Sequence, residues 1–275
     1  MNSSSRIFYD RLADCLESKR KLLRFILILF VFTSYIRGDS IKKAIPILCY
    51  HRFGTEVSDA TTVQTSVFEK HLAWLQTNGY TVISLERAIK YLQEEIQSIP
   101  NKSVVITVDD GHKSVYTVMA PLVKKYGIPV TLFIYPSAIS NAKYAMTWEQ
   151  LWELEATMLF RVESHTYWHP HFKEEKKKLS ADEYARFVNK QLMVSKQILE
   201  KKMGHEIKYL AWPFGIYDDE LQTKAAQAGY GAALSIDGRH ATSKDSLMAI
   251  PRYMIVSKHN IKVFEKMINE DKNGK

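Results

Sequence analysis

From about residue 45 onward, short apolar runs alternate with longer stretches whose apolar residues recur every three or four positions. The short runs are typical of buried strands, and the longer spacing is typical of amphipathic helices. The runs Val104–Val108 and Val130–Tyr135 are largely apolar and β-branched, as expected of parallel strands that helices cover on both faces. The pattern therefore predicts a parallel sheet enclosed by helices.

The predicted elements alternate along the chain without a linker or an internal repeat. The predicted strands are Pro46–Tyr50, Thr81–Ser84, Val104–Val108, Val130–Tyr135, Arg161–Ser164, Tyr209–Trp212 and Gly231–Leu234. The predicted helices are Ser66–Asn78, Leu85–Glu95, Ser114–Tyr126, Thr147–Ala156, Ala181–Met203 and Asp218–Ala228. This order predicts one α/β domain, either a barrel or an open sheet. In both architectures the chemistry belongs at the carboxyl ends of the strands.

The most apolar segment, Phe25–Ile36, lies before this region and follows a basic stretch at residues 19–24. That order is typical of an export signal. The run is shorter than the roughly 20 residues of a spanning helix, and no cleavage motif stands out after it. We interpret residues 1–38 as a cytoplasmic tail plus signal or short anchor, with possible membrane association through residues 22–36. Whether it is cleaved stays open, and an N-terminal helix of a cytosolic protein is the alternative. The basic flank predicts that residues 39–275 lie outside the cytoplasmic membrane.

Composition narrows the function classes. The formal net charge is +8, but the lysine-rich stretches Lys173–Lys178 and Lys190–Lys202 also contain acidic residues. They are interpreted as solvated helix faces, or alternatively as a patch attracted to an anionic surface. Nucleic acid is not an expected partner, because no zinc knuckle, arginine-rich arm or aromatic RNA-binding motif accompanies the charge. Two cysteines, Cys15 and Cys49, exclude a disulfide framework.

Two adjacent carboxylates stand where a predicted strand ends. Asp109 and Asp110 directly follow Val104–Val108 and precede Gly111. Neighbouring carboxylates repel each other and lose hydration when buried, so the pair is costly unless a cation or a proton lies between them. Helix capping is the alternative, because Asp before Gly is a frequent turn signal.

A histidine pair follows another predicted strand. His165 and His169 lie in the segment SHTYWHP at residues 164–170. A separation of four residues puts both imidazoles on one side of either a helix or an extended chain. Two imidazoles and one carboxylate can hold a divalent metal and leave positions open for water and substrate. A histidine pair at this spacing, taken alone, more often has a structural role, so the Asp pair at a second strand end is what favours a metal site.

A third segment, AWPFG at residues 211–215, follows the strand predicted at Tyr209–Trp212. Pro213 fixes the backbone and Gly215 permits a tight turn, so the N–H of Phe214 could point at a developing oxyanion. An ordinary turn is the alternative.

In order, TVDDG at 107–111, SHTYWHP at 164–170 and WPFG at 212–215 resemble the first three motifs of the polysaccharide deacetylases, also called the NodB-homology or carbohydrate esterase family 4 domain. The resemblance spans about residues 45–256, with LCYHR at 48–52 and PRY at 251–253. It implies a distorted (β/α) barrel of about seven parallel strands and hydrolysis of N-acetyl groups on amino-sugar polymers. The extracytoplasmic branch that acts on poly-N-acetylglucosamine looks most similar.

The resemblance also implies roles for individual residues. Asp109 matches the general base, and Asp110, His165 and His169 match the ligands of a divalent metal. Zinc is the first candidate, with iron, cobalt and nickel as alternatives. Phe214 would offer its N–H to the oxyanion. The predicted substrate contacts lie inside the motif segments and are Trp168, Trp212 and Pro213.

The chain departs from the family pattern twice. Many members carry Arg two residues before the third-motif Pro, whereas Ala211 stands here. Arg252 is the predicted substitute, provided that its strand lies beside Asp109. Many members also end in a Leu-x-x-His motif that supplies the general acid, and this chain has no clear copy. The acid is therefore left open among His51, His171, His240 and His259.

The main hypothesis is a metal-dependent N-deacetylase of an N-acetylglucosamine polymer. The missing Arg and His suggest, as one alternative, a carbohydrate-binding relative without turnover. Another alternative keeps the chemistry but takes peptidoglycan, chitin or an ester-linked acetyl group as substrate. Further aromatic residues near the motifs could stack on sugars or pack in the core, and these are Tyr144, Trp148, Trp152 and Tyr167.

Overall fold

The computed structural model describes residues 44–269. The segment at residues 22–36, interpreted as a signal or anchor, lies outside the described residues. Within residues 44–269, no helix combines the length and the apolar character that crossing a membrane requires.

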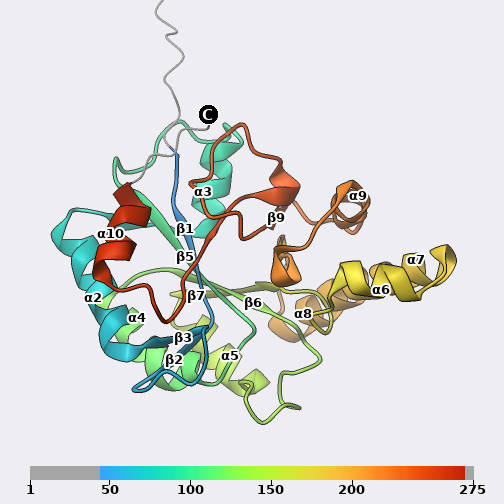
Figure 1. The fold of residues 1–275 in the computed structure, drawn as a ribbon, viewed down its shortest axis with the longest axis horizontal. Helices are drawn as coiled ribbons and strands as arrows, with labels where there is room; N and C mark the ends of the chain where they lie inside the picture. The colour runs from blue at the N-terminus through green and yellow to red at the C-terminus, as the bar shows by residue number, and fades with distance from the viewer. Residues whose placement is uncertain (1–43, 270–275) are drawn as a thin grey trace, which may run out of the picture. The chain divides into compact units, whose positions relative to one another are not determined.

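A parallel sheet forms the centre of the fold (Figure 1). Its main path runs in the order β10-β1-β5-β6-β7-β8-β9, and β4 pairs with β5 beside that path. The strands are β1 (Ile47–Tyr50), β4 (Thr81–Val82), β5 (Ser103–Asp109), β6 (Val130–Ile134), β7 (Phe160–Ser164), β8 (Tyr209–Ala211), β9 (Ala232–Leu234) and β10 (Tyr253–Met254). A separate parallel pair joins β2 (Arg52–Gly54) to β3 (Thr62–Gln64).

The sheet curls toward closure. Leu234 at the end of β9 bridges to Ile250, which lies just before β10, and Ser235 N donates to Ile250 O at 2.8 Å. Because β10 in turn pairs with β1, the last strands return to the first one. The seven strands of the main path thus form a distorted (β/α) barrel, which confirms the predicted fold.

Helices surround this sheet (Figure 1). They are α2 (Thr65–Thr77), α3 (Leu85–Leu92), α4 (Ala120–Tyr126), α5 (Trp148–Ala156), α6 (Phe172–Lys178), α7 (Ala181–Asn189), α8 (Ser195–Met203), α9 (Asp219–Gln227) and α10 (Ile261–Asn269). Side chains alternate between the two faces of each strand. In β5, Val104, Ile106 and Val108 pack with the helices, whereas Val105 belongs to a second apolar cluster with Phe133 on the other face of the sheet.

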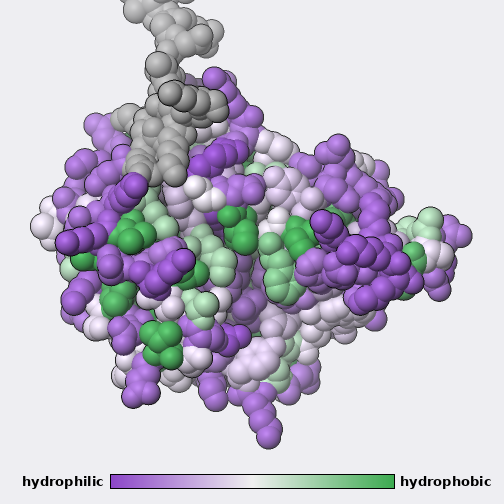
Figure 2. All heavy atoms as spheres, in the orientation of Figure 1, coloured by the Kyte–Doolittle hydropathy of each residue, from purple (hydrophilic) through white to green (hydrophobic). Residues whose placement is uncertain are grey.

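The lysine-rich segment at residues 173–178 is α6, which projects from the sheet together with α7 (Figure 1). Lys176 pairs with Asp218 and Glu220, and Lys177 with Glu174. This projecting part of the surface is mostly hydrophilic (Figure 2). Paired and exposed lysines of this kind support the interpretation of a solvated helix face.

Two helices predicted as continuous contain π turns. The predicted helix Ser114–Tyr126 begins with η1 (Val115–Met119), and the predicted helix Ala181–Met203 is divided by η2 (Lys190–Val194). A π turn widens the backbone by one residue and is often found at functional sites.

Candidate active site

The two adjacent carboxylates lie at the carboxyl end of β5. Asp109 is the last residue of the strand, and Asp110 has a left-handed backbone with φ of 73°. Gly111 follows with φ of 73°, and a Cβ there would lie 2.9 Å from Cδ1 of Ile134. Asp109 is buried and Asp110 is partly exposed, and each has a carboxylate oxygen within 3.8 Å of Nε2 of His165.

Asp110, His165 and His169 converge on one point. Nε2 of His165 lies 3.7 Å from Oδ1 of Asp110, and Nε2 of His169 lies 3.6 Å from the same oxygen. One ligand atom from each residue falls within 4.8 Å of the others. The two histidines come from the loop after β7, so the carboxyl ends of β5 and β7, the strands on either side of β6, bring the three side chains together.

This cluster suits a divalent cation. Oδ1 of Asp110 is buried and has no hydrogen-bond partner among the described residues. Burial raises the pKa of Asp110, lowers the pKa of His165 to about 3 and lowers the pKa of His169. Both imidazoles are therefore neutral near pH 7, which is the form that binds metals. Nδ1 of His165 lies 2.8 Å from the carbonyl oxygen of Ala211, which fixes the ring and leaves Nε2 for a ligand.

Asp109 is held by Arg252. Two hydrogen bonds of 2.8 Å join the guanidinium to both carboxylate oxygens, and both side chains are buried. Burial alone would raise the pKa of Asp109, but Arg252 outweighs it and holds that pKa well below its usual range. Arg252 thus gives Asp109 a guanidinium partner, which Ala211 cannot provide.

His51 also reaches Asp109. A ring nitrogen of His51, Sγ of Cys49 and a carboxylate oxygen of Asp109 lie within 4.8 Å of one another. Nδ1 of His51 is buried without a hydrogen-bond partner in the described part of the chain. Two of the other candidate acids serve elsewhere, because His240 contacts the Met267 carbonyl at 3.0 Å and His259 accepts from Val256 N at 3.2 Å.

Phe214 borders the metal cluster. Its backbone is left-handed, with φ of 56°, and its ring centroid lies 4.5 Å from that of His169. The side chain is 55% exposed. His171 lies behind it, with ring centroids 5.4 Å apart, and accepts from Glu174 N at the start of α6.

Two predicted substrate contacts are wrong. Trp212 is fully buried and its indole N–H donates to Met248 O at 2.8 Å, and Pro213 is buried as well. Both side chains pack into the fold, so a sugar cannot reach them. Trp168, in contrast, is 40% exposed.

Tyr135 is a site residue that the sequence interpretation missed. It directly follows β6, and its ring centroid lies 5.5 Å from that of His169. Its hydroxyl bonds to that of Tyr144, whose ring stacks on His112. The available signal was the strand-end position, which Tyr135 shares with Asp109.

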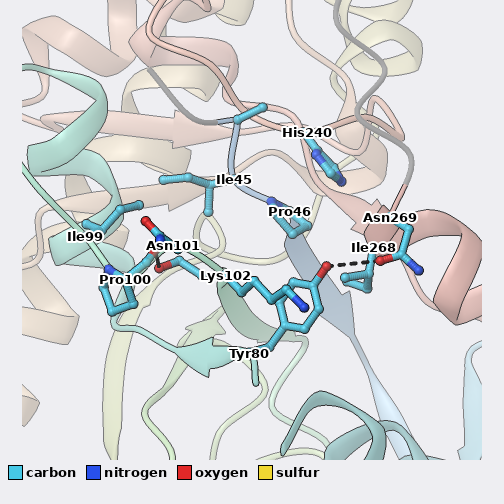
Figure 3. Close-up of a pocket in the computed structure, with 12 residues that line it drawn as sticks. Ile45, Pro46, Tyr80, Ile99, Pro100, Asn101, Lys102, His240, Ile268 and Asn269 are labelled. Carbon is cyan, nitrogen blue, oxygen red and sulfur yellow. Dashed lines mark hydrogen bonds between the residues drawn. The ribbon is translucent and has the colours of Figure 1, made fainter. Parts of the chain in front are cut away.

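A separate pocket of about 260 Å³ includes none of these site residues in its lining, and Figure 3 shows the residues that line it. Its lining includes Ile45 and Pro46 just before β1, and Lys102 just before β5. Tyr80 donates there to Asn269 at 3.1 Å. These are the amino ends of the strands, whereas the carboxylates and histidines lie at the carboxyl ends. We therefore assign the candidate active site to the carboxyl ends of the strands, where the carboxylates and histidines lie, and not to this pocket.

Comparison with known proteins agrees with this arrangement. Residues 97–233 match the family model described as polysaccharide deacetylase. The chain belongs to the polysaccharide deacetylase family. The matched range contains Asp109, Asp110, His165, His169 and Phe214.

Relatives and solved structures extend this likeness. The deacetylase is 28% identical over 199 residues to a poly-beta-1,6-N-acetyl-D-glucosamine N-deacetylase of Staphylococcus aureus, covering 70% of this chain and 68% of the relative. Its fold resembles the Streptococcus pyogenes deacetylase PplD, with a TM-score of 0.73, 22% identity and coverage of 82% and 99%. IcaB from Ammonifex degensii gives a TM-score of 0.69 at 23% identity, with coverage of 82% and 95%.

Proposed function

We propose that this polysaccharide deacetylase removes N-acetyl groups from a polymer of N-acetylglucosamine, with poly-β-1,6-N-acetylglucosamine as the first candidate. The observation that carries the proposal is the convergence of Asp110, His165 and His169 beside an Asp109 that Arg252 keeps ionised. The name of the Staphylococcus aureus relative supports the choice of polymer.

A divalent cation fits the three ligands, and zinc is the first candidate ahead of iron, cobalt and nickel. Neutral imidazoles and one carboxylate are the donor set that zinc accepts while keeping a position open. When bound, the cation would supply a Lewis acid for the acetyl carbonyl.

Asp109 acts as the general base in this proposal. Its ionised carboxylate takes a proton from the attacking water, while Arg252 keeps the carboxylate in place through both oxygens. Positioned base catalysis of this kind contributes roughly 10²–10⁴-fold to a rate. The Phe214 N–H is assigned to the negative oxygen that develops as water attacks.

His51 is assigned as the proton donor. When the carbon–nitrogen bond breaks, the leaving sugar nitrogen needs a proton, and His51 is the candidate histidine placed beside Asp109. Arg252 and His51 thus fill the two roles whose apparent loss suggested a relative without turnover. Trp168 and Phe214 are the exposed aromatic residues assigned to sugar contact.

We further propose that the domain works outside the cytoplasmic membrane, exported or anchored through residues 22–36. The basic stretch followed by an apolar run supports this. Fractionation of cells expressing the full chain tests it, and recovery of the protein with the cytosol would contradict it.

The function is tested by acetate release from a panel of substrates: β-1,6-linked N-acetylglucosamine oligomers, chitin oligomers and peptidoglycan glycan strands. We expect the β-1,6 oligomers to react fastest and the Asp109→Asn variant to lose at least about 100-fold in kcat/KM. Asp219→Asn, on exposed α9, is the matched control and should keep full activity. Oligomer binding without acetate release by the unaltered protein would favour the carbohydrate-binding alternative.

A further inference from the structure

The loop that carries both histidine ligands is held in an unusual conformation. Thr166 has φ of 66° and His169 has φ of 61°, so two non-glycine residues of one short loop adopt left-handed backbone. Such residues persist only where surrounding contacts impose the conformation. Thr166 itself is fully buried. Some part of the fold must therefore hold this loop.

The π turn η2 makes those contacts. Gln191 is fully buried, and its side-chain oxygen accepts from Tyr167 N at 3.2 Å and from Trp168 N at 3.1 Å. These are the two N–H groups between Thr166 and the ligand His169. One amide oxygen thus satisfies two consecutive backbone donors of the ligand loop.

Ser195, the first residue after η2, holds the same loop from the next position. Its hydroxyl donates to Thr166 O at 2.8 Å and lies 3.0 Å from Oγ of Ser164. Tyr230 OH donates to that Ser164 hydroxyl at 2.8 Å. All of these side chains are buried, so water cannot readily replace the hydrogen bonds.

We infer that Gln191 and Ser195 form a clamp that sets the metal affinity of the deacetylase by holding the loop between His165 and His169. The π turn is what lets this clamp form, because the extra residue per turn changes which side chains face the loop. The two residues are positioning residues: they act on the ligands through the backbone and touch neither substrate nor metal. The inference rests on the metal site of the proposed function and not on the choice of polymer.

The side chain of Gln191 carries a further sign of this role. Its Nε2 is buried without a hydrogen-bond partner among the described residues, so only the oxygen is used. A buried amide is costly when half of it is unsatisfied. The useful group of Gln191 is therefore its acceptor oxygen. A side-chain carboxyl group at position 191 could supply the same acceptor.

Zinc affinity, measured by competition with a chromophoric chelator, tests the clamp without reference to activity. Gln191→Met removes the acceptor at similar volume, and we expect zinc binding about 10–100-fold weaker, as for other residues that orient metal ligands. Gln191→Glu keeps an acceptor oxygen and should recover most of the affinity. Gln150→Met is the matched control, since Gln150 also accepts from a backbone N–H, that of Thr147, but on α5.

Zinc affinity of Gln191→Met within twofold of the unaltered protein would overturn the clamp, as would equal losses in the Met and Glu variants. Should Gln191→Met not fold, Ser195→Ala decides the question through the Thr166 contact. Weaker zinc binding supports the clamp, and unchanged binding overturns it. A protein that binds zinc tightly but releases no acetate from any polymer would defeat the proposed function and leave the clamp standing.

Discussion

Arg252 and Asp109, 143 positions apart in the chain, form a buried pair with two hydrogen bonds of 2.8 Å. Ser235 O accepts from Nε of Arg252 at 3.0 Å, and Thr107 contacts the same guanidinium at 3.0 Å. The guanidinium is thus fixed on several sides, and it fixes the carboxylate in turn. Through these contacts Arg252 keeps the carboxylate of Asp109, the proposed base, ionised.

We predict that Arg252→Met lowers kcat/KM at least about 100-fold at neutral pH with zinc content unchanged. Arg252 lowers the pKa of Asp109, so its removal raises that pKa and moves the acid limb of the pH–rate profile to higher pH. The kcat/KM of Arg252→Lys should lie between that of the unaltered protein and that of Arg252→Met. A Met variant with a normal rate, normal zinc content and an unmoved acid limb would remove Arg252 from the account.

The proposed role of His51 as proton donor is tested by comparing an amide substrate with an ester substrate. The amine of an N-acetyl sugar needs a proton as it leaves, whereas the phenolate of 4-nitrophenyl acetate does not. His51→Gln should therefore lose about 100-fold or more on the oligomer and much less on the ester. His259→Gln is the control and should leave both rates intact. Equal losses on both substrates in His51→Gln would contradict its role as proton donor.

The two tryptophans of the motif segments should behave oppositely. Trp168 is exposed, so Trp168→Ala should raise KM for long oligomers several-fold with little change in urea stability. Trp212 is fully buried, so Trp212→Ala should cost about 3–5 kcal/mol in the free energy of unfolding. Urea denaturation and oligomer kinetics on both variants separate the effects. A stable Trp212→Ala enzyme with a raised KM would show that the burial argument is wrong.

The buried side chain of His71 should make the free energy of unfolding depend on pH. It is buried, stacks on Phe264 at 4.0 Å and contacts Tyr50 OH at 3.1 Å; burial lowers its pKa to about 4. Because the folded pKa lies below the unfolded one, its contribution is full above about pH 6.5 and is lost as pH falls toward 4. That loss is about 3 kcal/mol.

The matched variant is His71→Phe, which keeps an aromatic ring against Phe264 but cannot be protonated. Its free energy of unfolding, measured in urea from about pH 7 to pH 4, should fall less steeply than that of the unaltered protein. Parallel curves for the two proteins would exclude His71 as the cause.

The sequence predicted seven of the strands, namely β1 and β4 to β9, and it placed Asp110 and the two histidines at one end of the sheet, because strand ends and apolar runs are local signals. It missed β2, β3 and β10. The segments of β2 (RFG) and β3 (TVQ) each hold a single large apolar residue, so no apolar run marks them. The π turn at Lys190–Val194 was also missed, since the apolar spacing of the surrounding helix continues through it.

The direction of individual side chains also could not be predicted from the sequence. Trp212 follows a strand just as Asp109 ends one, yet it points into the core, and position relative to a strand does not decide which face a following side chain takes. Gln191 contacts a loop more than 20 residues earlier in the chain, and Arg252 contacts Asp109 143 residues earlier, so no local pattern indicates these contacts. Arg252 was proposed only because the usual position held Ala211.

The central claim is that a metal held by Asp110, His165 and His169 is required for N-deacetylation. The most direct measurement is acetate release from β-1,6-linked N-acetylglucosamine oligomers by protein stripped with a chelator and then titrated with zinc. The account predicts no release from the stripped protein, recovery that saturates at one zinc per chain, and no recovery in Asp110→Ala, while Asp219→Ala behaves normally. Undiminished release by the stripped protein, or full recovery in Asp110→Ala, would contradict it.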